Sequence, residues 1–409
     1  MSWKDKVLVF FSNFSLGMIV PIFSLVLCSH GCSAQSVGTA MLFFGLTVML
    51  VEIPSGIFAD LYGRKFSFLL SCVLGSVWAL ILLWADSFPA AVLVLVFRGL
   101  SAAFSSGSLD ALVVDKVLKE KGSRGLEEAV ASLQMFQCIG IAGGSLTAGW
   151  IPYSEGYSVH LLVLAAFYLL TALLGLSLPS ERKGCESRQG CAGEERAKAE
   201  KSASGSGRIS LRGHLRVMRR LFADRPAIRS VVHCMVLAAT VQFVLEIYWQ
   251  PRLAEIIGAG RQAVFGILGA AAYLATTFGC FLMGKAKPES GKSRWGMYLS
   301  LCLGFAGMTA ALSLAGSLFG FSSGYLVIYL LLGMLSVSEQ TIINGEVPGQ
   351  VRASMLSVSS FASRSGGMLS SAASSALMLA GDIGFVWRVT ALAAAGGLGL
   401  VIMLRSKSG

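Results

Sequence analysis

Residues 52–65 read Glu-Ile-Pro-Ser-Gly-Ile-Phe-Ala-Asp-Leu-Tyr-Gly-Arg-Lys and end a long apolar run. Gly56 allows two helix backbones to approach closely, as small residues do within membranes. Gly63 allows the tight turn that such a short connection requires. Asp60 is expected to accept hydrogen bonds at a helix start, and Arg64 to pair with a carboxylate. The stretch therefore predicts two packed apolar helices joined by a short, charged loop.

The composition of the whole chain places these helices in a membrane. The 409 residues are 55% hydrophobic and 13% charged, with a mean hydropathy of +0.70. A soluble chain carries about 25% charged residues, so this chain lacks the charge to cover a globular surface. Disordered, collagen-like and coiled-coil proteins are excluded by the same composition. The net charge of +11 therefore needs an explanation other than nucleic-acid binding.

Membrane-spanning helices need about 20 mainly apolar residues each, and twelve stretches meet this requirement. They are residues 6–28, 36–58, 66–86, 89–112, 130–152, 157–178, 228–250, 263–285, 295–316, 322–344, 353–378 and 383–404. We therefore predict an all-α polytopic membrane protein. Its expected parts are an N-terminal six-helix bundle (residues 1–179), a basic cytoplasmic linker (180–227) and a C-terminal six-helix bundle (228–409).

The linker and the loops determine the expected orientation. Most of the 33 lysines and arginines fall in the loops on one side, which predicts that both termini and the linker are cytoplasmic. Residues 211–222 suit an amphipathic helix on an anionic leaflet, and an ordinary basic loop suits them equally. The first apolar run is too long for a cleavable signal peptide. We thus expect a multi-pass protein of the inner (plasma) membrane.

The motif in residues 52–65 resembles the signature loop of the major facilitator superfamily, Gly-x-x-x-Asp-x-x-Gly-Arg-Lys/Arg, between the second and third helices. Its positions are filled by Gly56, Asp60, Gly63, Arg64 and Lys65. The resemblance implies twelve helices in two bundles and a cytoplasmic loop that latches the two halves together. Asp115 is the candidate partner of Arg64 in this latch. Alternatively, Arg64 and Lys65 only enforce the membrane topology.

The fourth segment contains Arg98 followed by Gly99 and small residues as far as Asp110. It resembles a second motif of the family, although the Gln that precedes the glycine there is missing. The resemblance implies a link between Arg98 and proton coupling. Asp110, a charge within the same segment, is a further candidate for proton coupling or for the substrate cavity. An arginine within an apolar helix must also face a partner or water, unless it extends to the membrane surface.

The fifth segment contains Gly140-Ile-Ala-Gly-Gly-Ser-Leu-Thr-Ala-Gly149 but lacks the proline of the family's antiporter motif. Antiport therefore remains open, and a smooth face for helix packing explains the glycines equally well.

The seventh segment has a polar stripe, because Gln242, Glu246 and Gln250 recur at i, i+4 and i+8. An isolated carboxyl in a membrane helix is a candidate proton carrier or cation site. The Tyr-Trp-Gln-Pro that ends the stripe, at residues 248–251, resembles a pattern of bacterial drug-efflux-like members. Trp249 suits an interfacial anchor equally well.

The remaining candidates lie in four other segments. Further cavity residues are expected at Asn13 in the first segment, at Glu339, Gln340 and Asn344 in the tenth, and at Arg364 in the eleventh. We expect Arg364 to pair with a carboxylate, Glu339 first. Glu52 is expected to act as a gate or a structural ion-pair residue.

These features predict a secondary transporter that binds a small molecule between its halves. The leading hypothesis is proton-coupled export of an amphipathic drug or metabolite. The alternatives are a proton-coupled importer of a polar nutrient and a non-transporting sensor or lipid-handling protein. No Walker motif, catalytic cluster or metal-spaced His/Cys set is found, so no enzyme activity, cofactor or nucleic-acid partner is expected, and the proton gradient is the expected driving force. We expect a monomer in the lipid bilayer, and pairing of Cys28 with Cys32 stays open.

Overall fold

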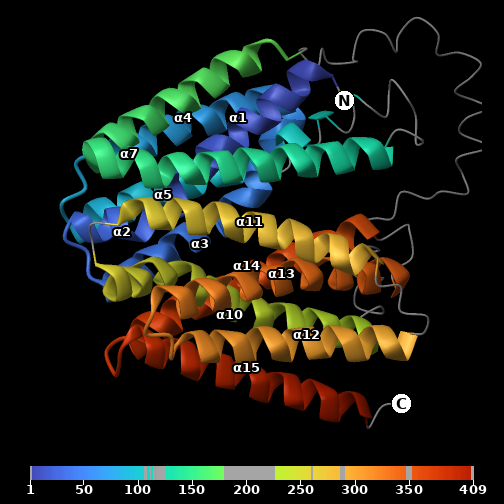
Figure 1. The fold of residues 1–409 in the computed structure, drawn as a ribbon. Coiled ribbons are helices and arrows are strands. Elements are labelled where there is room, and N and C mark those ends of the chain that lie inside the picture. Colours follow the sequence, from blue (N-terminus) through green and yellow to red (C-terminus); the bar gives the residue numbers. More distant parts are fainter. Residues whose placement is uncertain are drawn as a thin grey trace, which may run out of the picture.

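The computed structural model describes residues 2–105, 108–110, 112–113, 116, 126–178, 226–258, 261–285, 291–346 and 352–406. Every regular element in these residues is an α-helix, which confirms the predicted fold class. The helices run side by side, and both chain termini lie at one end of the bundle, called the terminal end below (Figure 1). The opposite end is called the distal end. Residues 180–225 of the predicted linker, with the candidate amphipathic helix, lie outside the described residues, and its last two residues begin a helix.

The twelve predicted segments coincide with described helices. In the N-terminal half these are α1 (Trp3–Ile19), α2 (Phe23–Ser29), α3 (Ala34–Tyr62), α4 (Arg64–Leu82), α5 (Phe88–Ser105) and α7 (Leu126–Leu176). In the C-terminal half they are α10 (Pro226–Ile257), α11 (Gln262–Lys285), α12 (Gly291–Leu312), α13 (Leu318–Glu346), α14 (Arg352–Leu377) and α15 (Ile383–Ser406). Within the described residues, nine helices are long and apolar enough to cross a membrane, or ten with the bent α1–α2 pair. This number is consistent with twelve spans.

Two of the predicted segments differ in shape from a straight span. The first is broken into α1 and α2, which meet at 44° around Pro21, because proline lacks the N–H that would continue the helix. The fifth and sixth segments form α7, which bends at Gly156, where φ is +86°. Only glycine adopts such a backbone angle without strain.

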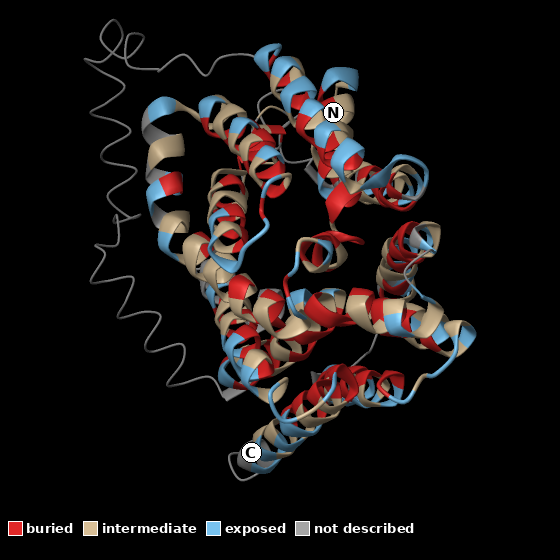
Figure 2. Ribbon diagram, turned by 90° about the vertical axis from the view of Figure 1, so that its left-hand side faces the viewer, coloured by how far each residue is buried: buried red, intermediate tan, exposed pale blue. Residues whose placement is uncertain are grey.

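The two halves touch each other through a small set of helix pairs. The pairs are α7 with α11, α3 with α14, and α10 with α2 and α3. At the distal end α7 and α11 approach very closely, since a methyl group on Gly266 would meet the carbonyl oxygen of Ser145 and lie 2.6 Å from the nitrogen of Gly149. Viewed from that end, buried residues line the faces that the helices turn toward one another (Figure 2).

Candidate functional site

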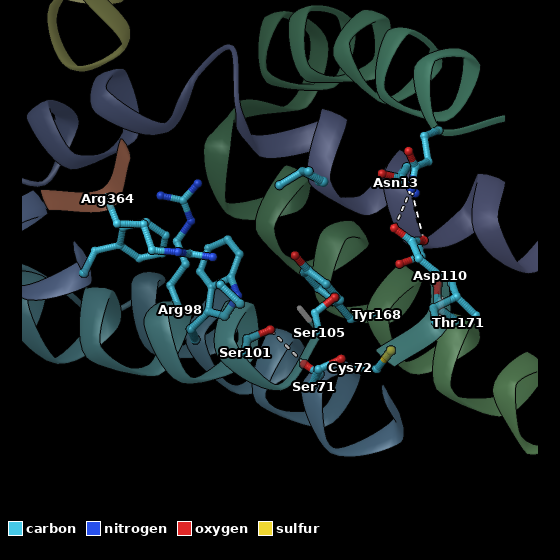
Figure 3. Close-up of a pocket in the computed structure, with 17 residues that line it drawn as sticks. Asn13, Ser71, Cys72, Arg98, Ser101, Ser105, Asp110, Tyr168, Thr171 and Arg364 are labelled. Carbon is cyan, nitrogen blue, oxygen red and sulfur yellow. Dashed lines mark hydrogen bonds between the residues drawn. The ribbon is translucent and has the colours of Figure 1, made fainter. Parts of the chain in front are cut away.

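Two adjacent cavities lie among the helices, and Arg98 belongs to the lining of both. The first cavity has a volume of about 350 Å³, and its lining runs from Arg98, Ser101 and Ser105 of α5 to Asp110 (Figure 3). The second has a volume of about 230 Å³ and lies between the halves. Of the predicted residues, the first is lined by Asn13, Arg98, Asp110 and Arg364, and the second by Arg98, Gln242, Glu246 and Gln250.

The guanidinium of Arg98 lies among aromatic rings. Its Cζ atom is 4.2 Å from the ring centroid of Phe23, 5.0 Å from that of Phe44 and 5.9 Å from that of Trp78. Its Nη1 atom is buried and makes no hydrogen bond within the described part of the chain. Arg98 therefore points into the protein and does not extend to the membrane surface.

Glu246 ends a chain of hydrogen bonds in the C-terminal half. The hydroxyl of Tyr325 donates to that of Tyr329 at 3.1 Å, and the Tyr329 hydroxyl donates to Glu246. Tyr273 packs edge-on against Tyr329 and lines the second cavity beside Glu246. A carboxyl is thus held on the wall of a cavity between the two halves.

The first cavity has a polar wall nearer the terminal end. Both oxygens of Asp110 accept hydrogen bonds of 3.0 Å from the amide nitrogen of Gln137 on α7. Asn13 donates to the carbonyl oxygen of Val9 at 2.9 Å, one turn earlier in α1. The hydrogen bonds of Asp110 connect this wall to α7, and Asn13 adds a polar group from α1.

Gln250 connects the two halves at the break between α1 and α2. Its amide nitrogen donates to the carbonyl oxygen of Val20 at 2.6 Å, and its Oε1 accepts from the N–H of Ser24 at 2.8 Å. The Ser24 hydroxyl donates to the carbonyl oxygen of Ile247 at 2.8 Å. The Gln250 side chain therefore satisfies backbone groups that the helix break leaves unpaired.

Arg364 pairs with Glu52, and the expected pair with Glu339 is wrong. The Nε of Arg364 lies 3.2 Å from a carboxylate oxygen of Glu52, across the α3–α14 contact between the halves. Glu339 is in α13, which packs against α11, α12 and α10 in its own half. Gln340 is exposed, and the side chain of Asn344 lies outside the described part of the structure.

The signature loop is described in part. Gly63 has a φ of +96°, which confirms the predicted tight turn. The expectation for Gly56 is wrong in this conformation, because a methyl group there would meet no atom within 4 Å. The Nζ of Lys65 donates to the carbonyl oxygens of Leu176 at 2.7 Å and Leu178 at 2.6 Å. The Asp60 side chain and all of Asp115 lie outside the described residues, so the latch remains a prediction.

Several contributors were not predicted from the sequence. Tyr325 and Tyr329 recur at i, i+4, which places them on one helix face, but nothing nearby in the sequence shows that this face meets Glu246. Gln137 was missed for the same reason. The cysteines Cys28 and Cys32 are free thiols.

Known proteins similar to this chain are membrane transporters. The profile of the Major Facilitator Superfamily matches residues 7–371. An uncharacterized MFS-type transporter of Bacillus subtilis (strain 168), YxaM, is 27% identical over 161 residues, which span 38% of this chain and 38% of YxaM.

Solved structures share the fold. The nucleoside transporter NupG has a TM-score of 0.69 at 15% identity, covering 98% of this chain and 97% of its own. A bacterial homologue of the human lysosomal transporter Spinster, in an inward-facing and occupied conformation, has a TM-score of 0.71 at 17% identity, covering 98% and 96%.

Proposed function

The chain belongs to the major facilitator superfamily, and on that premise we propose that it is a secondary transporter that exports an amphipathic small molecule in exchange for protons. The substrate binds in the cavities that meet at Arg98, and rocking of the halves alternates access to it. Both termini and the linker are cytoplasmic in this proposal, as the distribution of basic residues indicates.

The position of Glu246 is the observation that carries the proposal. An ionisable side chain within a membrane helix is costly, and it marks an ion or proton path when it faces a cavity. Glu246 faces the second cavity, and its described hydrogen-bond partner is an uncharged tyrosine, not a cation. Such a carboxyl can take up and release a proton as the cavity changes its access.

The cavities lead toward one end of the molecule. The contacts of Gln250 and Gly266 hold the distal end together, and the first cavity continues toward the terminal end. With the termini in the cytoplasm, this conformation faces the cytoplasm, as importers and exporters both do at one stage of alternating access. The second cavity, whose wall is mainly apolar and carries a few polar groups, suits an amphipathic molecule.

A replacement of Glu246 tests proton coupling. In proteoliposomes, we expect Glu246→Gln to abolish pH-gradient-driven transport but to keep exchange of substrate between equal concentrations, because only the proton carrier is lost. The control is Glu255→Gln on the same helix, since Glu255 is 52% exposed and paired with Arg252 away from the cavities. Gradient-driven transport by the Glu246→Gln protein at the rate of the control would contradict the proposal.

Import of a polar nutrient is the second candidate, because Arg98 has no carboxylate partner among the described residues and so suits an anionic substrate. A compound panel applied to efflux-deficient cells, with and without a proton uncoupler, distinguishes the two directions. Export predicts that the uncoupler raises cellular accumulation of the substrate, whereas import predicts that it lowers accumulation.

A further inference from the structure

Arg98 is a buried cation whose counter-ion is not found among the described residues. Each described ion pair joins other side chains, and Nη1 of Arg98 is buried with no hydrogen-bond partner. Removal of a guanidinium from water is costly unless its charge and its N–H groups are matched. Because Arg98 lines both cavities, its charge and N–H groups can be matched by water or by a bound molecule there.

The neighbouring aromatic rings meet only part of this requirement. Phe23, Phe44 and Trp78 lie 4.2–5.9 Å from the guanidinium carbon and stabilise the cation through their π faces. An aromatic ring does not accept an N–H hydrogen bond as strong as the one that a carboxylate or phosphate oxygen accepts. Figure 3 shows Arg98 and Arg364 among the side chains that line the first cavity.

The charges around the cavities limit the charge of the molecule. Arg364 also lines the first cavity, but Glu52 neutralises it at 3.2 Å. The acidic groups on the two cavity walls, Asp110 and Glu246, disfavour additional negative charge. One unmatched positive charge therefore favours an anion with one negative charge over a polyanion.

The second cavity supplies apolar surface next to the same cation. Its lining includes Val20, Phe23, Met41, Phe243 and Tyr273. We propose that the transported molecule is an amphipathic organic monoanion, with its anionic group on Arg98 and its apolar body against this wall. This inference rests on the proposed transport function and names the substrate class of the same cavity.

The test compares anions with uncharged molecules of the same shape. The probes are octanoate, phenylbutyrate and naphthylacetate, each beside its amide, added to the full-length protein in nanodiscs without a pH gradient. Trp78 lies next to Arg98, so binding is measured by tryptophan fluorescence and by thermal stabilisation. Because a guanidinium–carboxylate pair is a charge-assisted, bidentate interaction, we expect at least one anion to bind about tenfold or more tightly than its amide.

Two variants assign the preference to Arg98. We expect Arg98→Gln to remove the preference for the anion, and Arg98→Lys to keep part of it because the charge is retained. The control Arg388→Gln removes an arginine from the exposed pair with Asp382 and is expected to bind like the wild type. Equal binding of every anion and its amide by the wild-type protein would overturn the proposal, as would an unchanged preference in Arg98→Gln or its complete loss in folded Arg98→Lys.

The result is independent of the proton-coupling test. Binding is measured without a gradient, so a preference for anions persists even if Glu246→Gln transports normally. Failure of the anion preference, conversely, leaves proton-coupled transport of an uncharged or cationic molecule in place.

Discussion

At the scale of single residues, one face of α10 holds three polar side chains with different surroundings. Gln242 and Glu246 face the second cavity, and Glu246 is also held by Tyr329. Gln250 lies at the rim of that cavity, but both ends of its amide are bonded to the break between α1 and α2. We infer that the inner part of the stripe serves binding and coupling, and that Gln250 closes the distal end.

Replacement of Gln250 tests this closing role. Gln250→Ala leaves the N–H of Ser24 and the carbonyl of Val20 without partners, and each buried unpaired group costs about 1–3 kcal/mol. We expect faster hydrogen–deuterium exchange in the peptide that covers residues 18–29. In the control Gln35→Ala, exchange should stay at the wild-type rate, because the described contact of Gln35 to the other half uses its backbone oxygen. Unchanged exchange in Gln250→Ala would show that the side chain does not hold the break.

The positions of polar residues were predictable where the cost of exposing a polar group to lipid decides them. Asn13, Arg98, Gln242 and Glu246 were expected in a cavity because polar groups avoid lipid, and the structure places all four there. The ion pairs were not predictable, because a partner on another helix leaves no pattern in the nearby sequence. Arg364, for example, was expected to pair with Glu339 but pairs with Glu52 of the other half.

At the scale of helices, glycines determine which pairs approach closely. A methyl group on Gly144 of α7 would lie 2.7 Å from the nitrogen of Met18 in α1, and one on Gly149 would lie 2.9 Å from the carbonyl oxygen of Ala263. The glycines of the fifth predicted segment therefore allow close helix packing, which was one of the two interpretations of that segment. The first contact stabilises the N-terminal half, and the second joins the halves.

The α7–α11 contact supplies a prediction at this scale. Gly266→Ala places a methyl group against Ser145 and Gly149, and such overpacking costs about 1–3 kcal/mol. We expect a lower Tm and weaker transport. In the matched variant Gly307→Ala, the added methyl group has no atom within 4 Å. We expect this variant to be as stable as the wild type, or more stable by up to about 1 kcal/mol. Equal Tm values for the two variants would exclude a tight α7–α11 contact.

The helices themselves were largely predictable, because an apolar run of sufficient length is a direct requirement of the bilayer. Their bends were less so. Pro21 interrupts the first segment, but the sequence does not show that the backbone groups at this break bond to Gln250, which is more than two hundred residues away. The serine-rich α14 is not among the nine described spans, because its serines lower its hydropathy; it packs against α10 and α3.

At the scale of the whole molecule, the Arg364–Glu52 pair joins the halves along α3 and α14, and several other contacts between them lie at the distal end. They include the bridge of Gln250 to the α1–α2 break, the hydrogen bond of Thr39 with Ser375, and the close approach of Gly149 and Gly266. A transporter that alternates access must break such contacts and form others at the terminal end. The central claim is that the halves rock about the cavities that Arg98 and Glu246 line.

Distances between spin labels measure this rocking directly. In a protein with its nine cysteines replaced by serine, one pair of labels is placed at Trp84 and Leu379, which are 81% and 74% exposed at the distal end. A second pair is placed at Tyr62 and Lys285, where α3 and α11 reach the terminal end. We predict that Gln250→Ala lengthens the distal distance and shortens the terminal distance. Unchanged distances, or lengthening of both together, would contradict the account.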